Sequence, residues 1–207
     1  MLKSAALIKA AAALVKYAKK YAADLQSEKL AEIVVNHASA AAITGMGAGV
    51  LPGLGALIAG GISIGAIWHM YYAIGKYLQL NWGMDMLKAA ATAILTNIVH
   101  QMWGVLALEL AATLIPGFAI PATGFIFFGV TYLSGLTFLL VLGHLFKAGK
   151  NLDLVKLDDL MESFRDIKNE TNLADELKNV RNDFKEMRKD GSLKKNSEGV
   201  DISSDNA

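Results

Sequence analysis

Apolar residues form long uninterrupted runs between residues 31 and 148. From Ile33 to Gly75 the chain contains no Asp, Glu, Lys or Arg. This run is too long for one ordinary helix, and Leu51-Pro52-Gly53 divides it, because Pro-Gly pairs mark turns. We therefore expect two apolar helices here, over about His37–Leu51 and Leu54–Tyr77.

Two further apolar segments complete the pattern. Met84–Ile115 ends at Pro116-Gly117, and Ala119–Leu145 follows it. A membrane-spanning helix needs about 20 apolar residues, because each residue advances about 1.5 Å through a hydrocarbon core about 30 Å thick. The last three of the four segments reach this length, and the first is marginal. The pattern predicts an all-α fold, a membrane bundle of about four apolar helices in residues 31–148.

The bundle contains an internal repeat. Val50-Leu51-Pro52-Gly53 matches Leu114-Ile115-Pro116-Gly117, and at the same offset Gly60 matches Gly124. Similarity at a fixed offset indicates a duplicated structural unit. We expect two helix–Pro-Gly–helix repeats, whose turns are formed by Pro52, Gly53, Pro116 and Gly117.

Residues 1–30 are expected to form a basic amphipathic helix. Leu7 and Leu14 recur at helical spacing, while Lys9, Lys16 and Lys20 share another face. Such a helix either lies in a membrane interface or packs against the bundle. Both arrangements remain open at this point.

Residues 149–189 predict a charged helical arm. Apolar residues recur there every three or four positions on two short helices, as in a heptad seam. Each helix is too short to be stable alone, so the arm should pack on itself, on a second copy or on another protein. Residues 190–207 are rich in Ser, Asp, Asn and Gly and are expected to be disordered. The stripe assigned to a partner consists of Leu173, Leu177, Val180, Phe184 and Met187.

The lysines predict a topology. They lie before the first apolar segment, beside the turn between the second and third, and after the fourth, whereas the Pro-Gly turns carry none. The positive-inside rule then places both termini in the cytoplasm. Re-entrant or buried hairpins share these ends and remain an alternative. The formal net charge of +1 gives no indication of nucleic acid, and the expected partner is the lipid bilayer.

Glycines are spaced for close helix packing. Small residues four apart let helix backbones approach each other in lipid. The plain interpretation is ordinary bundle packing, and the functional one is a self-association face. The glycines assigned to helix packing are Gly45, Gly49, Gly53, Gly61 and Gly65.

The third apolar segment has a polar side. In a membrane, polar groups need partners, so this side should face the bundle interior. It would provide either hydrogen bonds between helices or the lining of a water-filled path. This interior polar stripe consists of Thr92, Thr96, Asn97, His100 and Gln101.

No catalytic or metal-binding pattern stands out. The chain has no cysteine, which excludes disulfides, thiolate catalysis and Cys-ligated metals. His37, His69 and His144 could meet near the cytoplasmic ends as a metal site or pH sensor, but interfacial histidines are the preferred interpretation because no histidine pair has helical ligand spacing. We therefore predict no catalytic residue, no metal and no cofactor, and we do not expect an enzyme.

Short motifs in residues 40–80 resemble a known family. Ile43-Thr44-Gly45, Leu51-Pro52-Gly53 and Ile74-Gly75-Lys76-Tyr77 are similar to motifs of the YcjF-like bacterial family of unknown function, and Leu114–Gly117 followed by Thr131-Tyr132-Leu133 resembles its second Pro-Gly element. The family comprises hydrophobic helical domains often found beside or fused to GTPase domains. The resemblance covers about residues 38–145 and implies a location in the bacterial inner membrane. By analogy alone it also suggests a GTPase partner, although this chain carries no GTPase domain of its own.

Three functions follow from these patterns. The leading expectation is a non-enzymatic integral membrane scaffold or anchor that presents the arm to a protein partner, or to a second copy in a homo-oligomer. The alternative is a small membrane channel, pore or transporter that uses the polar stripe and the glycine-rich hairpin. A third interpretation is a protein that stores apolar hairpins in a water-soluble state and inserts them later.

Overall fold

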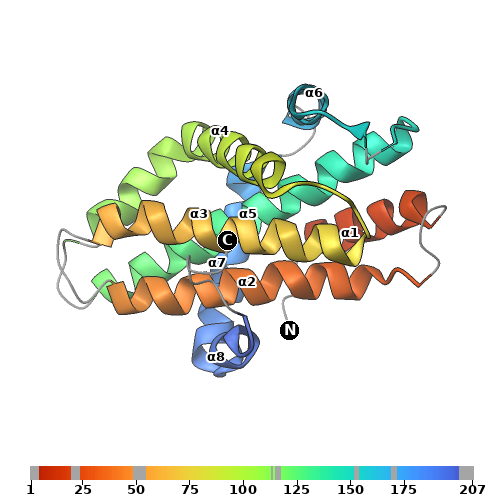
Figure 1. The fold of residues 1–207 in the computed structure, drawn as a ribbon. Coiled ribbons are helices and arrows are strands. Elements are labelled where there is room, and N and C mark those ends of the chain that lie inside the picture. Colours follow the sequence, from red (N-terminus) through yellow and green to blue (C-terminus); the bar gives the residue numbers. More distant parts are fainter. Residues whose placement is uncertain are drawn as a thin grey trace.

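The computed structural model describes residues 5–19, 24–48, 55–112, 114, 118–151, 154–168 and 172–200. Within these residues the chain forms eight helices and no strand (Figure 1). The all-α prediction is therefore confirmed. The helices are α1 (Ala5–Ala18), α2 (Ser27–Ala48), α3 (Gly55–Tyr77), α4 (Met84–Ala112), α5 (Ala119–Lys147), α6 (Leu157–Lys168), α7 (Leu173–Lys189) and α8 (Ser192–Ser197).

The helix α5 forms the centre of the molecule. It contacts α1, α2, α3, α4, α6 and α7, and α2 and α3 lie side by side next to it (Figure 1). The helix α7 crosses the long helices steeply and leads to α8, which packs on α2. A helix that is apolar on all sides is stable in water only where other elements cover every side. The sequence of α5 therefore explains its central position.

A glycine ends α5 and starts the charged arm. Gly149 has φ of +73°, a left-handed conformation that glycine adopts without steric cost. Its N–H donates to the Phe146 carbonyl, and the Lys150 N–H donates to the Leu145 carbonyl. This pair of bonds is the Schellman arrangement that satisfies the last carbonyls of a helix. The chain can then turn back along α5 as α6 and α7.

The polar side of α4 faces outward, which corrects the predicted interior stripe. Thr92, Thr96, His100 and Gln101 are exposed, and Asn97 is half-buried. The two threonine hydroxyls donate to carbonyls of the preceding helical turn, at 2.9 Å for Thr92 and 2.8 Å for Thr96. The inward face of α4 consists of Leu87, Ala90, Ala91, Ile94 and Ile98. This is the pattern of a helix that packs on a core and borders water.

Two predicted boundaries also differ from the structure. The helix α2 begins at Ser27, ahead of the His37 start expected for the first apolar segment. The tail predicted to be disordered contains α8, whose Leu193 is 2% exposed. Burial of this one leucine gives a short polar segment a reason to fold.

Several predicted residues cannot be placed. Pro52, Gly53, Pro116, Gly117 and Gly49 lie outside the described residues. The described helices that flank the predicted turns pair as expected for two hairpins, because α2 contacts α3 and α4 contacts α5.

Candidate functional site

The candidate functional element is α5 together with the helices that cover it. Among the described residues, α5 is the one helix long and apolar enough to cross a membrane, and 89% of its most apolar stretch is buried inside the protein. The core helix of a water-soluble bundle meets the same criterion. The surroundings of α5 therefore carry the functional argument. We call the helices that contact it, α1, α2, α3, α4, α6 and α7, the sheath.

Side chains of the sheath rest directly on the α5 backbone at glycines. A Cβ added at Gly124 would lie 2.5 Å from Met46 Cγ, and one at Gly129 would lie 2.6 Å from Leu177 Cδ1. A Cβ at Gly135 would lie 2.7 Å from Val34 Cγ1. Carbon atoms do not approach so closely, so these positions accept only glycine without movement of the neighbour.

At one predicted packing glycine the arrangement is reversed, because the glycine belongs to a sheath helix and the side chain that lies on it belongs to α5. Gly45 on α2 is buried, and a Cβ there would lie 2.7 Å from the ring of Phe127 on α5. Gly65 on α3 is also buried, and Gly61 lies within α3. The helix-packing assignment of Gly45 thus corresponds to a specific contact with α5.

The sheath also supplies hydrogen bonds to polar groups on α5. The Tyr71 hydroxyl of α3 lies 2.9 Å from Ser134 Oγ and donates to the Ser134 carbonyl at 3.1 Å. Burial raises the pKa of Tyr71 well above its usual range, so the hydroxyl keeps its proton. On α7, Glu176 is 8% exposed and accepts a hydrogen bond of 3.2 Å from the Tyr132 hydroxyl. Neither pairing was predicted from the sequence, because no local pattern links residues so far apart.

The predicted partner stripe of the arm is buried on α5. All five of its residues are at most 7% exposed. The Phe184 ring lies 5.7 Å from the Phe125 ring and 5.4 Å from the Phe128 ring, centroid to centroid. In this structure the stripe therefore packs against its own chain. The five residues are Leu173, Leu177, Val180, Phe184 and Met187.

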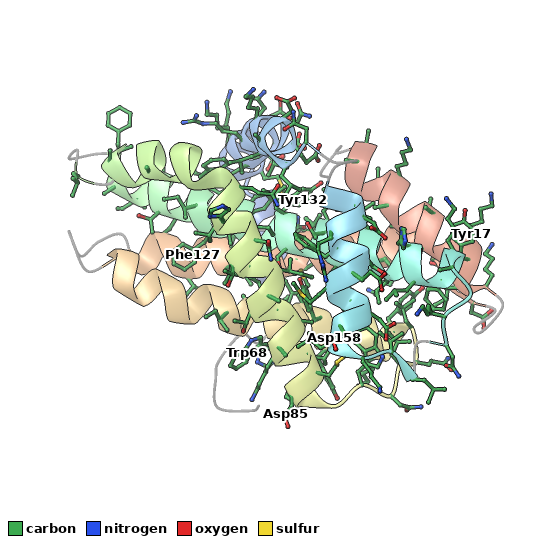
Figure 2. All side chains as sticks on the ribbon, turned by 90° about the horizontal axis from the view of Figure 1, so that it is seen from above. Tyr17, Trp68, Asp85, Phe127, Tyr132 and Asp158 are labelled. Carbon is green, nitrogen blue, oxygen red and sulfur yellow. The ribbon has the colours of Figure 1, made fainter. Side chains whose placement is uncertain are left out.

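Apart from Glu176, the described charged side chains of the sheath are exposed or half-buried. In Figure 2 Phe127 and Tyr132 lie among the helices and Asp85 lies at the lower edge of the view; Asp85 and Asp158 are both exposed. Lys9 and Lys16 of α1 are exposed while its Leu7 and Leu14 are buried. Of the two arrangements open for the N-terminal helix, the structure has the one in which it packs on the bundle, where α1 contacts α5 and α2.

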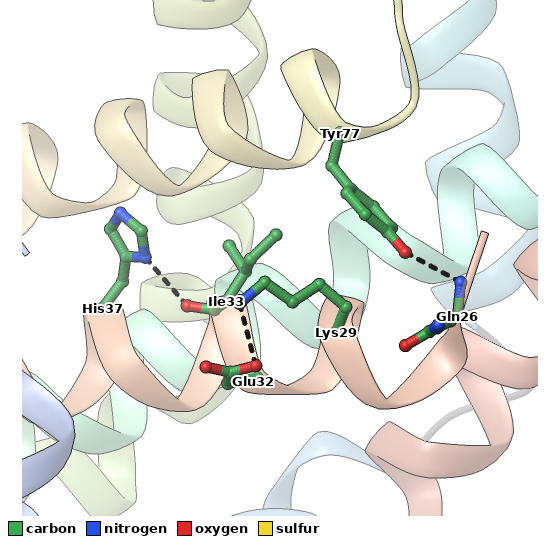
Figure 3. Close-up of polar contacts among 6 residues, drawn as sticks. All are labelled: Gln26, Lys29, Glu32, Ile33, His37 and Tyr77. Atoms are coloured by element: carbon green, nitrogen blue, oxygen red, sulfur yellow. Dashed lines mark hydrogen bonds and ion pairs between the residues drawn. The ribbon is translucent and has the colours of Figure 1, made fainter. Parts of the chain in front are cut away.

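Two histidines occupy contacts between helices. His37 on α2 is 8% exposed, and its Nδ1 lies 2.8 Å from the Ile33 carbonyl oxygen (Figure 3). Burial lowers the pKa of His37, the hydrogen bond to Ile33 opposes this shift, and the neighbouring His69 lowers the pKa further. His144 Nε2 on α5 lies 3.4 Å from a carboxylate oxygen of Asp166 on α6. No group of three or more metal-ligating side chains occurs among the described residues.

Comparisons with protein-family models, with curated proteins and with solved structures give no match for this chain. The resemblance to the YcjF-like family therefore stays a prediction from short motifs. Function has to be inferred from the side-chain arrangement itself.

Proposed function

We propose that this chain is a non-enzymatic, membrane-active protein that keeps α5 covered in a water-compatible bundle and transfers it into a lipid bilayer. The observation that carries the proposal is the sheath. The described helix most suited to lipid is also the one most completely covered, and apart from Glu176 the described charged side chains of the covering helices are exposed or half-buried.

The orientation of α4 supports water, rather than lipid, outside the folded bundle. In a four-span bundle His100 and Gln101 would face hydrocarbon. Polar groups there lack partners, and each unsatisfied group costs several kcal/mol. The same face is stable in water. The four-span arrangement with cytoplasmic termini is therefore less well supported than a bundle that releases α5 at the membrane.

The scaffold and channel functions would then belong to the protein after α5 has moved into the bilayer. A scaffold needs the apolar stripe of α7 to be free, and that stripe is free only when α7 leaves α5. A pore needs inserted helices, and a bilayer anchor needs the same insertion without leakage. A GTPase partner rests on the motif analogy alone.

The test uses a disulfide tether between α2 and α5. Because the chain has no cysteine, Val34→Cys and Gly135→Cys introduce the only thiols. A Cβ at Gly135 would lie 2.7 and 2.9 Å from the two γ-carbons of Val34, so the two Cβ atoms are within the roughly 4.5 Å that a disulfide allows. Oxidation then holds α5 in the bundle, and a reducing agent frees it.

The oxidised protein should be monodisperse without detergent and should leave lipid vesicles during a carbonate wash. After reduction, the same protein should stay with the vesicles. The single variants Val34→Cys and Gly135→Cys are the controls, the second because a Cβ at Gly135 also lies 2.8 Å from Met70 Sδ, and each should respond equally in both redox states. Equal carbonate resistance of the oxidised and reduced double variant, or aggregation of the unmodified chain without detergent, would contradict the proposal. Release of a dye trapped inside the vesicles would indicate a pore, whereas insertion without dye release would indicate an anchor.

A further inference from the structure

A small cleft lies between the N-terminal end of α5, the C-terminal end of α4 and the C-terminal half of α7. Its volume is about 270 Å³. The apolar part of its lining includes Phe118, Pro121, Phe125 and Phe184. Pockets that enclose whole small molecules usually measure about 300–1,000 Å³. This cleft is therefore suited to one end of a larger molecule.

Three cations of α7 line the other side of the cleft. Arg181, Lys185 and Arg188 follow one another at intervals of four and three residues, so they share one helix face. The Arg181 guanidinium carbon lies 5.5 Å from the centroid of the Phe125 ring, and this contact joins the basic side to the apolar side. Among the described residues that line the cleft, none is acidic.

Two of these cations have no charged partner in the described part of the chain. The salt bridges found there involve neither Lys185 nor Arg188. Both side chains are exposed at the mouth of the cleft. They are therefore available to an anion from outside the protein.

Exposed apolar side chains gather at the same end. Leu114 is 73% exposed, Phe118 is 62% exposed and Ile120 is 45% exposed. Singly exposed apolar residues need no explanation, but several together beside a cleft mark a binding surface. Large apolar side chains next to cations are the composition of segments that enter the interface of an anionic membrane.

We propose that this cleft docks the protein on a bilayer by binding the headgroup of an anionic phospholipid. The phosphate is held by Arg181, Lys185 and Arg188, the first carbons of the lipid contact the apolar lining, and the acyl chains stay in the bilayer. Leu114, Phe118 and Ile120 enter the interface beside it. A choline headgroup would bring its own cation to this basic rim, so a lipid with net negative charge is preferred.

This inference rests on the proposed function, because it names the lipid and the end of the molecule at which transfer starts. Docking through the cleft puts the first turn of α5 at the bilayer surface. Residues of α4 and α7 line the cleft there together with Pro121 and Phe125 of α5. The transfer would then begin at the N-terminal end of α5.

The experiment measures sedimentation of the full chain with vesicles of phosphatidylcholine alone and of phosphatidylcholine mixed with phosphatidylglycerol. The test variant combines Lys185→Gln with Arg188→Gln. The control combines Lys194→Gln with Lys195→Gln, which removes the same charge from exposed positions on α8. A cation near an anionic surface changes affinity about fivefold, so the test variant should bind mixed vesicles roughly 25-fold more weakly. The control should stay within about threefold of the parent chain, because Lys194 and Lys195 do not line the cleft.

A third variant tests the apolar part of the surface. Phe118→Ser should weaken binding to mixed vesicles without affecting folding, because Phe118 is largely exposed. Equal binding of the parent chain to both kinds of vesicle overturns the inference, as does an equal loss in the test and control pairs. Far-ultraviolet circular dichroism checks that each variant is folded.

The redox tether separates the two proposals. If the tethered, oxidised chain sediments selectively with phosphatidylglycerol but α5 never inserts after reduction, the docking site stands and the proposed function fails. If α5 inserts after reduction with no preference for phosphatidylglycerol and no effect of Lys185 and Arg188, the proposed function stands and the docking site fails.

Discussion

Gly45 and Gly47 lie two residues apart on α2 and meet different surroundings. A Cβ at Gly45 would lie 2.7 Å from Phe127 Cγ and Cδ2, whereas one at Gly47 would meet nothing within 4 Å. Gly45→Ala should therefore destabilise the protein by about 1–3 kcal/mol through overpacking. Gly47→Ala should leave stability unchanged or raise it by up to about 1 kcal/mol, because alanine favours the helix.

Urea unfolding of both variants measures this difference. The two substitutions add the same methyl group to the same helix, so helix propensity cancels in the comparison. Equal unfolding midpoints would show that the ring of Phe127 moves aside without cost and that the contact does not fix the position of α2.

His37 should make stability depend on pH. Its pKa in the folded protein is below the value of about 6.5 expected for the unfolded chain. The unfolded state therefore binds more protons once the pH falls below that value, and folding stability declines as the pH falls. Above this pH both states are neutral and His37 contributes no pH dependence. Denaturant unfolding from about pH 7 to pH 5 should show the decline, and His37→Gln should flatten it.

His100→Gln is the matched control, because His100 is exposed on α4. It should leave the slope of stability against pH unchanged. A slope equally steep in His37→Gln would assign the pH dependence to groups other than His37.

The polar residues of α4 show what a helical pattern can and cannot predict. The spacing correctly grouped Thr92, Thr96, Asn97, His100 and Gln101 on one side. Periodicity reports which residues share a face, but the medium beyond that face sets its direction. A membrane reverses the direction that water imposes. The grouping was therefore correct, whereas the interior direction, inferred for a helix in a membrane, differs from the outward direction in the structure.

At the scale of elements, α7 should act as a cover over α5. Phe184 is 2% exposed and packs on Phe125 and Phe128. Phe184→Ala should cost about 3–5 kcal/mol, the usual loss for a buried phenylalanine. It should also increase binding of a dye specific for exposed apolar surface, because α7 then leaves α5 uncovered more often. Equilibrium unfolding and dye fluorescence measure the two effects.

Asn179→Ala is the control for this helix, since Asn179 is exposed on α7. It should change neither stability nor dye binding appreciably. If Phe184→Ala lowers stability but leaves dye binding at the parent level in the native range, α7 does not open independently, and the sheath is released only by global unfolding.

The bounds of a helix could be predicted from the sequence where turn residues such as Pro-Gly mark its ends. Long apolar runs bounded by Pro-Gly pairs placed α3, α4 and α5 within a few residues of their observed bounds. The start of α2 was missed, although Ser27 and Glu28 are residues that favour a helix start. They were assigned to the end of the preceding helix because the apolar run begins only later. The helix α8 was missed because its polarity hides the single buried Leu193.

At the scale of the whole molecule, the sequence could not separate a membrane bundle from a covered one. A helix apolar on every side is suited to lipid and to the centre of a bundle alike. Whether other helices cover the apolar helix depends on contacts between distant segments, such as Tyr71 with Ser134 and Glu176 with Tyr132. These contacts have no local signature. The charged arm was predicted as two helices, but its return onto α5 was not.

The cover of α5 comes from chain on both sides of it, and this has a consequence for synthesis. The helices α1 to α4 precede α5, whereas α6 and α7 follow it, and Lys189 lies about 40 residues beyond Lys147. At roughly 5–20 residues per second, the ribosome completes α7 about 2–8 s after α5. During this interval the face that carries Phe125, Phe128 and Tyr132 has no cover. The rate of translation beyond Lys147 therefore helps to decide whether a newly made chain closes its bundle or meets a bilayer first.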